Sequence, residues 1–186
     1  MKIALLLFEG MTALDAIGPL QVLSALPGAE VFPVASAPGP KRTDAGVALL
    51  AEHTLAAVPR PDIILVPGGM NMRPVMADPS VMEWLTSAHA TTTWTTSVCT
   101  GALVLGAAGL LRGLRATTHW AALGALRDFG AEPVEERMIR DGKVITGAGV
   151  SAGIDMAFAV VEALCGREIA DETAHYIDYP RQTTLG

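Results

Sequence analysis

The chain has 186 residues, of which 51% are hydrophobic and 17% are charged, and its formal net charge is −6. This length fits one domain with a substantial core, and the apolar content excludes an intrinsically disordered chain. No run of Lys or Arg forms a basic patch, which argues against binding to nucleic acid or to an acidic membrane surface. We therefore expect one domain over residues 1–186, and the modest acidic balance says little about its substrate.

The N-terminal apolar run could be mistaken for a secretion signal. Glu9 ends the run Ile3–Phe8 after six residues, and no suitable cleavage site follows, so a buried strand is the better interpretation. No other segment approaches an uninterrupted membrane span. Two cysteines, Cys99 and Cys165, in a chain without a secretion signal indicate a reducing compartment rather than a structural disulfide. We expect a cytoplasmic protein.

In chain order, short apolar runs alternate with longer helical segments, which is typical of a mostly parallel, doubly wound α/β sheet with helices on both faces. The first half predicts strands at Ile3–Phe8, Ala29–Ser36 and Asp62–Val66, and helices at Asp15–Leu26, interrupted by Gly18-Pro19, and at Ser80–Ala90. The apolar run of Asp62–Val66 is continuous rather than alternating, so this strand should be central and buried on both faces. A turn is expected at Pro38-Gly39-Pro40, and Thr43–Leu55 is ambiguous, with a short hairpin as one interpretation.

The second half continues the alternation of strands and helices. It predicts strands at Thr91–Val98 and Ala116–Thr118, and helices at Thr100–Leu111, Trp120–Phe129 and Ser151–Leu164. A β-hairpin is expected from Arg137–Arg140 and Val144–Thr146, because Asp141-Gly142 between them favours a tight hairpin turn. Gly130 and Gly166 should end the helices that precede them.

Three of the predicted strands end close to candidate functional residues. The first strand leads to Asp15, the Asp62–Val66 strand to Gly68-Gly69, and the Thr91–Val98 strand to Cys99. In open α/β sheets, ligands bind at the carboxyl ends of the strands, near the point where the strand order reverses. Parallel strands would bring these residues to one edge of the sheet, where we predict the functional site.

Cys99 lies in the segment Ser97-Val98-Cys99-Thr100-Gly101, which has the pattern of a nucleophile elbow, although a serine replaces the usual first glycine. Such a turn holds its residue in sparsely populated backbone geometry and exposes its side chain. Cys99 would also lie at a helix N-terminus, where the helix dipole favours the thiolate and lowers its pKa. The alternative is a buried, inert cysteine; the turn favours a reactive thiol at Cys99, whereas inertness is the better interpretation for Cys165.

Asp15 and the two glycines each allow two interpretations. Asp15 either caps a helix N-terminus or presents a carboxyl group to the Cys99 thiol, where burial would raise its pKa. Gly68-Gly69 is either a tight turn or a place where backbone N–H groups, such as those of Gly69 and Met70, approach a substrate and form an oxyanion hole.

His119 follows a predicted strand end and could reach the same edge, although a lone histidine is more often structural. The other histidines, His53, His89 and His175, show no spacing typical of a metal site. We expect no metal ion and no organic cofactor.

Five segments resemble the ThiJ/PfpI superfamily, in the same order and over nearly the whole chain: Asp15–Pro19, Pro67–Gly69, Ser97–Gly101, Ala116–Trp120 and Ala152–Asp155. Within this superfamily, the run from Ser97 to Trp120 is most similar to the bacterial isonitrile hydratases. The resemblance implies a flavodoxin-like fold, a homodimer and a thiol-dependent hydratase.

The activity implied by this resemblance is hydration of an isonitrile to an N-substituted formamide. Cys99 would attack the terminal carbon, Asp15 would move the protons, and Thr100 with the amides of Gly69 and Met70 would position the substrate. Peptidase members of the superfamily carry a histidine directly after the cysteine, and Thr100 stands there instead, so a protease would lack its base. The alternatives are glyoxalase-type chemistry at the same thiol and a non-enzymatic redox or ligand sensor that uses oxidation of Cys99.

Overall fold

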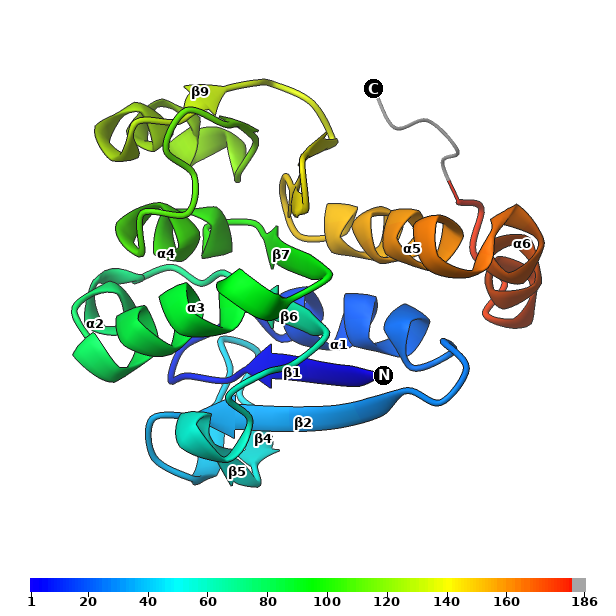
Figure 1. Ribbon diagram of the computed structural model, residues 1–186, viewed down its shortest axis with the longest axis horizontal. Helices are drawn as coiled ribbons and strands as arrows, with labels where there is room; N and C mark the ends of the chain where they lie inside the picture. Colours follow the sequence, from blue (N-terminus) through cyan, green and yellow to red (C-terminus); the bar gives the residue numbers. More distant parts are fainter. Residues whose placement is uncertain (182–186) are drawn as a thin grey trace.

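The computed structural model describes residues 1–181, and a seven-stranded sheet lies at its centre with helices on both faces (Figure 1). The strand order is β10-β11-β7-β6-β1-β2-β5, and every neighbouring pair is parallel except β10 with β11. The strands of this sheet are β1 (Lys2–Leu6), β2 (Glu30–Ala35), β5 (His53–Thr54), β6 (Ile63–Val66), β7 (Trp94–Val98), β10 (Met138–Asp141) and β11 (Val144–Gly147). Two smaller pairs are the antiparallel β3 (Gly39–Arg42) with β4 (Ala48–Ala51) and the parallel β8 (Arg115–Ala116) with β9 (Glu132–Pro133).

The helices connect the parallel strands. They are α1 (Ala13–Leu23), α2 (Arg73–Met76), α3 (Pro79–Thr91), α4 (Gly101–Ala107), α5 (Ala152–Cys165) and α6 (Arg167–Tyr176), with 3-10 helices η1 (Leu55–Ala57) and η2 (Trp120–Phe129). None of the helices within residues 1–181 combines the length and the apolar character needed to cross a membrane.

Alternate residues of β1 supply two hydrophobic cores. Ile3 and Leu5 pack on one face of the sheet with α1 and α5, whereas Ala4 and Leu6 pack on the other face with α2, α3 and α4. This division follows from strand geometry, since successive side chains point to opposite faces. The α/β, flavodoxin-like arrangement predicted from the sequence is therefore confirmed, with one set of helices on each face (Figure 1).

The central strand β6 is buried along its whole length, as its continuous apolar run predicted. It lies between β7 and β1, and the strand order reverses at β1, because β2 lies on the far side of β1 from β6. The carboxyl ends of β1, β6 and β7 therefore meet at the point where open α/β sheets bind their ligands.

Several elements differ from the sequence prediction. The short elements α2, β9 and η1 were not predicted, α4 ends at Ala107 rather than Leu111, and the predicted helix Trp120–Phe129 is a 3-10 helix. The β3–β4 hairpin begins at Gly39, inside the predicted Pro/Gly turn, since Pro40 lies in an isolated two-stranded pair where a missing N–H is tolerated. Helix α6 was not predicted, because its buried residues Ala170, Thr173 and Ala174 have small side chains and carry little hydrophobic signal. The predicted C-terminal cap Gly166 does end α5, with a φ of 87°.

Candidate active site

The three strand ends meet as the sequence predicted. Asp15, in the first turn of α1, accepts a hydrogen bond at Oδ2 from the Gly68 amide, 3.0 Å away, just after β6. Gly68 in turn lies against the turn after β7: a Cβ added to it would lie 2.6 Å from the Thr100 nitrogen and 2.9 Å from the Cys99 Cβ. Only glycine allows this approach, so Gly68 brings the carboxyl group and the thiol together.

Cys99 occupies a strained turn between β7 and α4. Its φ is 56°, in the left-handed region that residues with side chains rarely adopt. Its amide is held by the carbonyl oxygens of Gly147, at 3.1 Å, and Ala148, at 2.8 Å. Position 101, where the next helix begins, requires glycine, because a Cβ there would overlap the Val66 carbonyl oxygen. The predicted elbow geometry is confirmed.

The predicted exposure and acidity of the Cys99 thiol are wrong. Cys99 is only 6% exposed, and burial raises the pKa of its thiol to about 11, with a further contribution from the negative charge of Asp15. Helix α4 has only seven residues, and its dipole does not outweigh the loss of solvation. The thiol therefore begins any reaction in its protonated form at neutral pH.

Asp15 does not cap its helix. The N-cap residue of α1 is Thr12, and the free amide of Ala13 is instead satisfied by Asp44 Oδ1, 3.0 Å away, from the loop between β3 and β4. The Asp15 side chain is fully buried, and its Oδ1 has no conventional hydrogen-bond donor among residues 1–181.

Burial raises the pKa of Asp15 to about 7, partly offset by hydrogen bonds from Gly68 and from the Cys99 thiol. The structure thus favours the second interpretation of Asp15, a buried carboxyl group facing the thiol. A pKa near 7 lets one carboxyl group both accept and donate protons at neutral pH.

Thr100 and Gly69 are bonded to each other. The Thr100 hydroxyl accepts from the Gly69 amide at 2.9 Å and donates to the Gly69 carbonyl oxygen at 2.7 Å. The Gly69 amide is thus engaged, which corrects the expectation that it is available as an oxyanion donor. The Met70 amide takes part in none of the hydrogen bonds found in residues 1–181, and its side chain is 94% exposed.

One pair of backbone donors near Cys99 was not predicted from the sequence. The backbone N–H groups of Thr100 and Val150 lower the pKa of the Cys99 thiol, although by less than burial raises it. Val150 lies between β11 and α5, and the only signal for it was the Gly147-Ala148-Gly149 stretch before it. A backbone donor leaves no trace in residue type, so only the tertiary structure assigns it to the site.

His119 is a neighbour of the site that does not bond to the reactive pair. Its Nδ1 accepts from the Ala121 amide at 3.3 Å and caps η2, and a Cβ added at Gly149 would lie 3.3 Å from its ring. No hydrogen bond in residues 1–181 joins it to Cys99 or Asp15.

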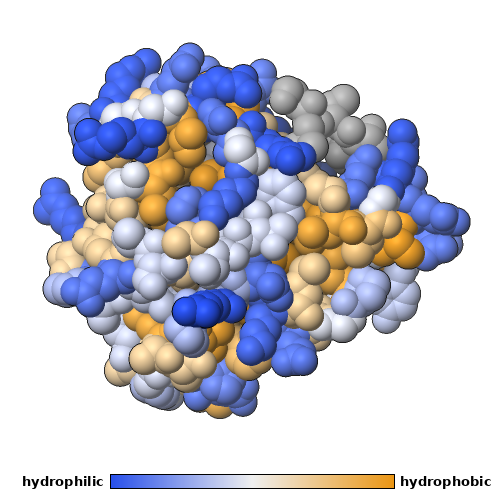
Figure 2. Space-filling model, in the orientation of Figure 1, coloured by the Kyte–Doolittle hydropathy of each residue, from blue (hydrophilic) through white to orange (hydrophobic). Residues whose placement is uncertain are grey.

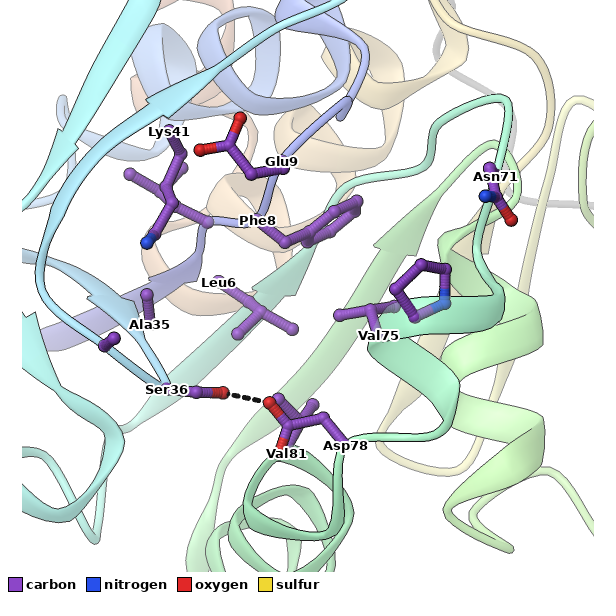
Figure 3. A pocket seen from close by; sticks show the side chains of 13 residues that line it. Leu6, Phe8, Glu9, Ala35, Ser36, Lys41, Asn71, Val75, Asp78 and Val81 are labelled. Carbon is purple, nitrogen blue, oxygen red and sulfur yellow. Dashed lines mark hydrogen bonds between the residues drawn. The ribbon is translucent and has the colours of Figure 1, made fainter.

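Two cavities lie near the carboxyl edge of the sheet. The first, of about 290 Å³, has apolar walls that include Leu6, Phe8 and Val75, with Glu9 and Lys41 on one side (Figure 3). Leu6 and Val75 belong to the core on the α2/α3/α4 face, whereas Cys99 belongs to the core on the α1/α5 face. Leu7 and Ala35 from the α1/α5 core also line this cavity, but neither Cys99 nor Asp15 does.

The second cavity, of about 280 Å³, adjoins the Cys99 turn. Its lining includes Thr118, Ala148 and the exposed Trp120. Thr118 Oγ1 donates to the Cys99 carbonyl oxygen at 2.7 Å, and Ala148 accepts from the Cys99 amide. Residues 1–181 contain no group of three or more His, Cys, Asp or Glu side chains able to hold a metal ion.

Several known proteins are similar to this chain in sequence. Residues 1–163 match the DJ-1/PfpI family. The chain is 41% identical over 179 residues to an isonitrile hydratase of Pseudomonas putida, covering 96% of this chain and 78% of that protein. It is 28% identical over 152 residues to a glutathione-independent glyoxalase of Caenorhabditis elegans, covering 81% of this chain and 77% of the relative.

The fold is also found among solved structures. A ThiJ/PfpI family protein from Pseudomonas syringae superimposes with a TM-score of 0.93 at 35% identity, covering 100% of this chain and 77% of the other. The shared fold, the matched sequence and the cysteine turn lead to one conclusion: this chain belongs to the DJ-1/PfpI family.

Proposed function

We propose that the protein hydrates an isonitrile, R–N≡C, to the N-substituted formamide, R–NH–CHO, with Cys99 as the nucleophile and Asp15 as the group that moves protons. The observation that carries the proposal is the pairing of a buried thiol with a fully buried carboxyl group whose pKa is raised to about 7. The similarity to the isonitrile hydratase of Pseudomonas putida supports this choice of substrate.

The first step is addition of the thiol to the terminal carbon of the isonitrile. The Sγ–H bond of Cys99 breaks, its proton passes through the Asp15 carboxylate to the isonitrile carbon, and a C–S bond forms. The product is a thioimidate, R–N=CH–S, on Cys99. Because the proton leaves while the C–S bond forms, no free thiolate accumulates, which suits a thiol with a pKa of about 11.

The second step is hydrolysis of the thioimidate. Asp15 takes a proton from water as the water oxygen bonds to the thioimidate carbon, and this proton is delivered to the nitrogen. The resulting adduct, R–NH–CH(OH)–S, collapses when the C–S bond breaks and the hydroxyl proton returns through Asp15 to the sulfur. One water is consumed, the thiol is regenerated, and Asp15 alternates between base and acid, as its pKa near 7 permits.

The remaining site residues would bind and orient the substrate. The Thr100 hydroxyl fixes the Gly69 peptide and thereby the following Met70 amide, which we assign as a donor to the substrate or to developing charge. The cavity beside Thr118 and Ala148 would receive the substituent R. His119, which lies close to Gly149 in the wall of this cavity, would shape the pocket.

The test is product formation by the purified protein from a panel of isonitriles, methylglyoxal and peptides. Formamide that carries one ¹⁸O from labelled water, detected by mass spectrometry, is the expected result. Lactate from methylglyoxal, with no formamide, would instead favour glyoxalase-type chemistry at the same thiol, as the named activity of the Caenorhabditis elegans relative suggests. A lasting oxidation of Cys99 without turnover of any compound would favour a sensor.

We also propose that the protein forms a symmetric homodimer through α1. Leu14 and Ile17 lie one turn apart on α1 and are 43% and 42% exposed, and both flank Asp15. Figure 2 shows further apolar side chains over α5, which packs beside α1. Light scattering should show a dimer at micromolar concentration and a monomer for Ile17→Glu; a monomeric parent protein would contradict the proposal.

A further inference from the structure

We propose that Arg137 and Asp155 are positioning residues that hold the segment 148–151 against Cys99 and thereby set the reactivity of its thiol. The inference rests on the proposed function only for the use of that thiol in turnover. Neither Arg137 nor Asp155 contacts Cys99, so any effect of these two residues on the thiol passes through the segment 148–151.

The two residues form a salt bridge in which the carboxylate is buried and the Arg137 side chain is 35% exposed. Asp155, in α5, is fully buried, and its Oδ2 accepts from Arg137 Nε at 2.6 Å and lies 2.5 Å from Arg137 Nη2. The hydroxyl of Tyr179 donates to the same oxygen at 3.1 Å. A buried ion pair adds little net stability compared with apolar packing, so stability alone is a weak reason for this arrangement.

Arg137 also holds both ends of the segment. Its carbonyl oxygen accepts from the Ala148 amide at 2.9 Å, and its Nη2 donates to Ser151 Oγ at 3.3 Å. The salt bridge with Asp155 fixes the guanidinium group, so the backbone and the side chain of one residue clamp residues 148–151 from the outer side.

The inner side of the segment faces Cys99. The Ala148 carbonyl oxygen accepts from the Cys99 amide at 2.8 Å, which supports the strained φ of that residue. The Val150 amide, in the same segment, lowers the pKa of the Cys99 thiol and so opposes the rise that burial causes. A displaced segment would lose this donor and leave the thiolate less stabilised.

Other charged and titratable groups also face this region. Asp15 approaches the thiol from α1, Asp44 faces Asp15 from the hairpin loop, and His119 lies against Gly149 from the start of η2. The charge of Arg137 is balanced by Asp155, and it is not among the groups that shift the Cys99 pKa. Arg137 therefore acts by position rather than by its field.

The experiment measures the rate of iodoacetamide alkylation at Cys99 in the intact chain by peptide mass spectrometry, from pH 7 to 9. In this range the rate follows the thiolate fraction. Arg137→Gln should slow alkylation of Cys99 about tenfold at each pH, as expected for loss of one hydrogen bond to a charged sulfur. Arg137→Lys, which keeps the charge, should restore part of the rate. Arg140→Gln, the same change at an exposed arginine of β10, should leave it unchanged.

Faster alkylation in Arg137→Gln would mean that the segment only shields the thiol, and an unchanged rate would mean no coupling; either result overturns the proposal. Should Arg137→Gln fail to fold, the double variant Arg137→Gln, Asp155→Asn removes both charges and leaves no unpaired ion. It should show the same slowing, and an unchanged or faster rate in it also overturns the proposal. Where isonitrile turnover is present, kcat should fall with KM unchanged; where it is absent, alkylation still decides.

Discussion

Cys99 and Cys165 are the same residue type in two different regions of one molecule. Cys165 is half-buried at the end of the regular helix α5, directly before Gly166. Cys99 is buried in a left-handed turn, beside a carboxyl group and beneath two backbone N–H donors. The difference shows that the chemistry of this thiol is set by its surroundings.

The surroundings of Cys99 act in opposite directions. Burial and the charge of Asp15 hold the thiol protonated, whereas the amides of Thr100 and Val150 favour the thiolate. Burial prevails, so the Cys99 thiol keeps its proton at neutral pH, whereas the pKa of Asp15 lies near neutrality. In the proposed mechanism the proton passes from the thiol to Asp15. Cys165 has no such partner among its described contacts.

The largest expected effect is on turnover. Cys99→Ser should lower formamide production by about three orders of magnitude or more, because a hydroxyl is a far weaker nucleophile toward the isonitrile carbon. Cys165→Ser should leave it unchanged, and product can be followed by mass spectrometry. A comparable loss of formamide production in both variants would show that the two thiols do not differ in their role.

Asp15→Asn tests the proton carrier. Asparagine keeps the size of the side chain but cannot exchange a proton, so turnover should fall about 10²–10⁴-fold. Combining it with Cys99→Ser should be hardly worse than either change alone, as for groups that act as one unit. Asp128→Asn, at an exposed carboxylate, is the matched control. Near-normal turnover by a folded Asp15→Asn protein would rule out the mechanism.

The same substitution changes how stability depends on pH. The pKa of Asp15 is raised from 3.8 to about 7 in the folded protein, so the folded state keeps a proton that the unfolded state loses between these values. The stabilising effect of this proton is present below pH 3.8 and is lost as pH rises through about 7. Asp15→Asn should therefore gain stability relative to the parent protein between pH 4 and 8, by about 4 kcal/mol at most. Urea unfolding of both proteins at pH 4 and pH 8 measures this gain. A difference in unfolding free energy between the two proteins that is the same at both pH values would contradict the raised pKa of Asp15.

Gly68→Ala should produce the smallest effect, and one confined to the Cys99 region. The new Cβ would lie 2.6 Å from the Thr100 nitrogen, so the protein should lose about 1–3 kcal/mol of stability and the Cys99 turn should shift. Gly124→Ala is the control, because its nearest contact would be 4.0 Å away, at a flexible arginine. Equal unfolding free energies for the two variants would show that the turn tolerates a side chain.

The sequence by itself predicted the doubly wound α/β sheet, the central β6, the turn at Cys99 and the meeting of Asp15, Gly68 and Cys99 at one edge. These follow from local signals: apolar runs of defined length, glycine at close approaches, and the geometry of parallel strands. The same local signals predict that Cys99, and not Cys165, is the reactive thiol.

Only the tertiary structure decided the charge state and the support of the site. Whether Asp15 caps a helix depended on Asp44 from a distant hairpin, and the acidity of Cys99 depended on how deeply the chain buries it. The Val150 donor and the Arg137–Asp155 salt bridge could not be predicted from the sequence either. Residue type and spacing specify which groups approach the site, but solvation and backbone direction arise from contacts between segments far apart in the chain, and these determine which proton moves.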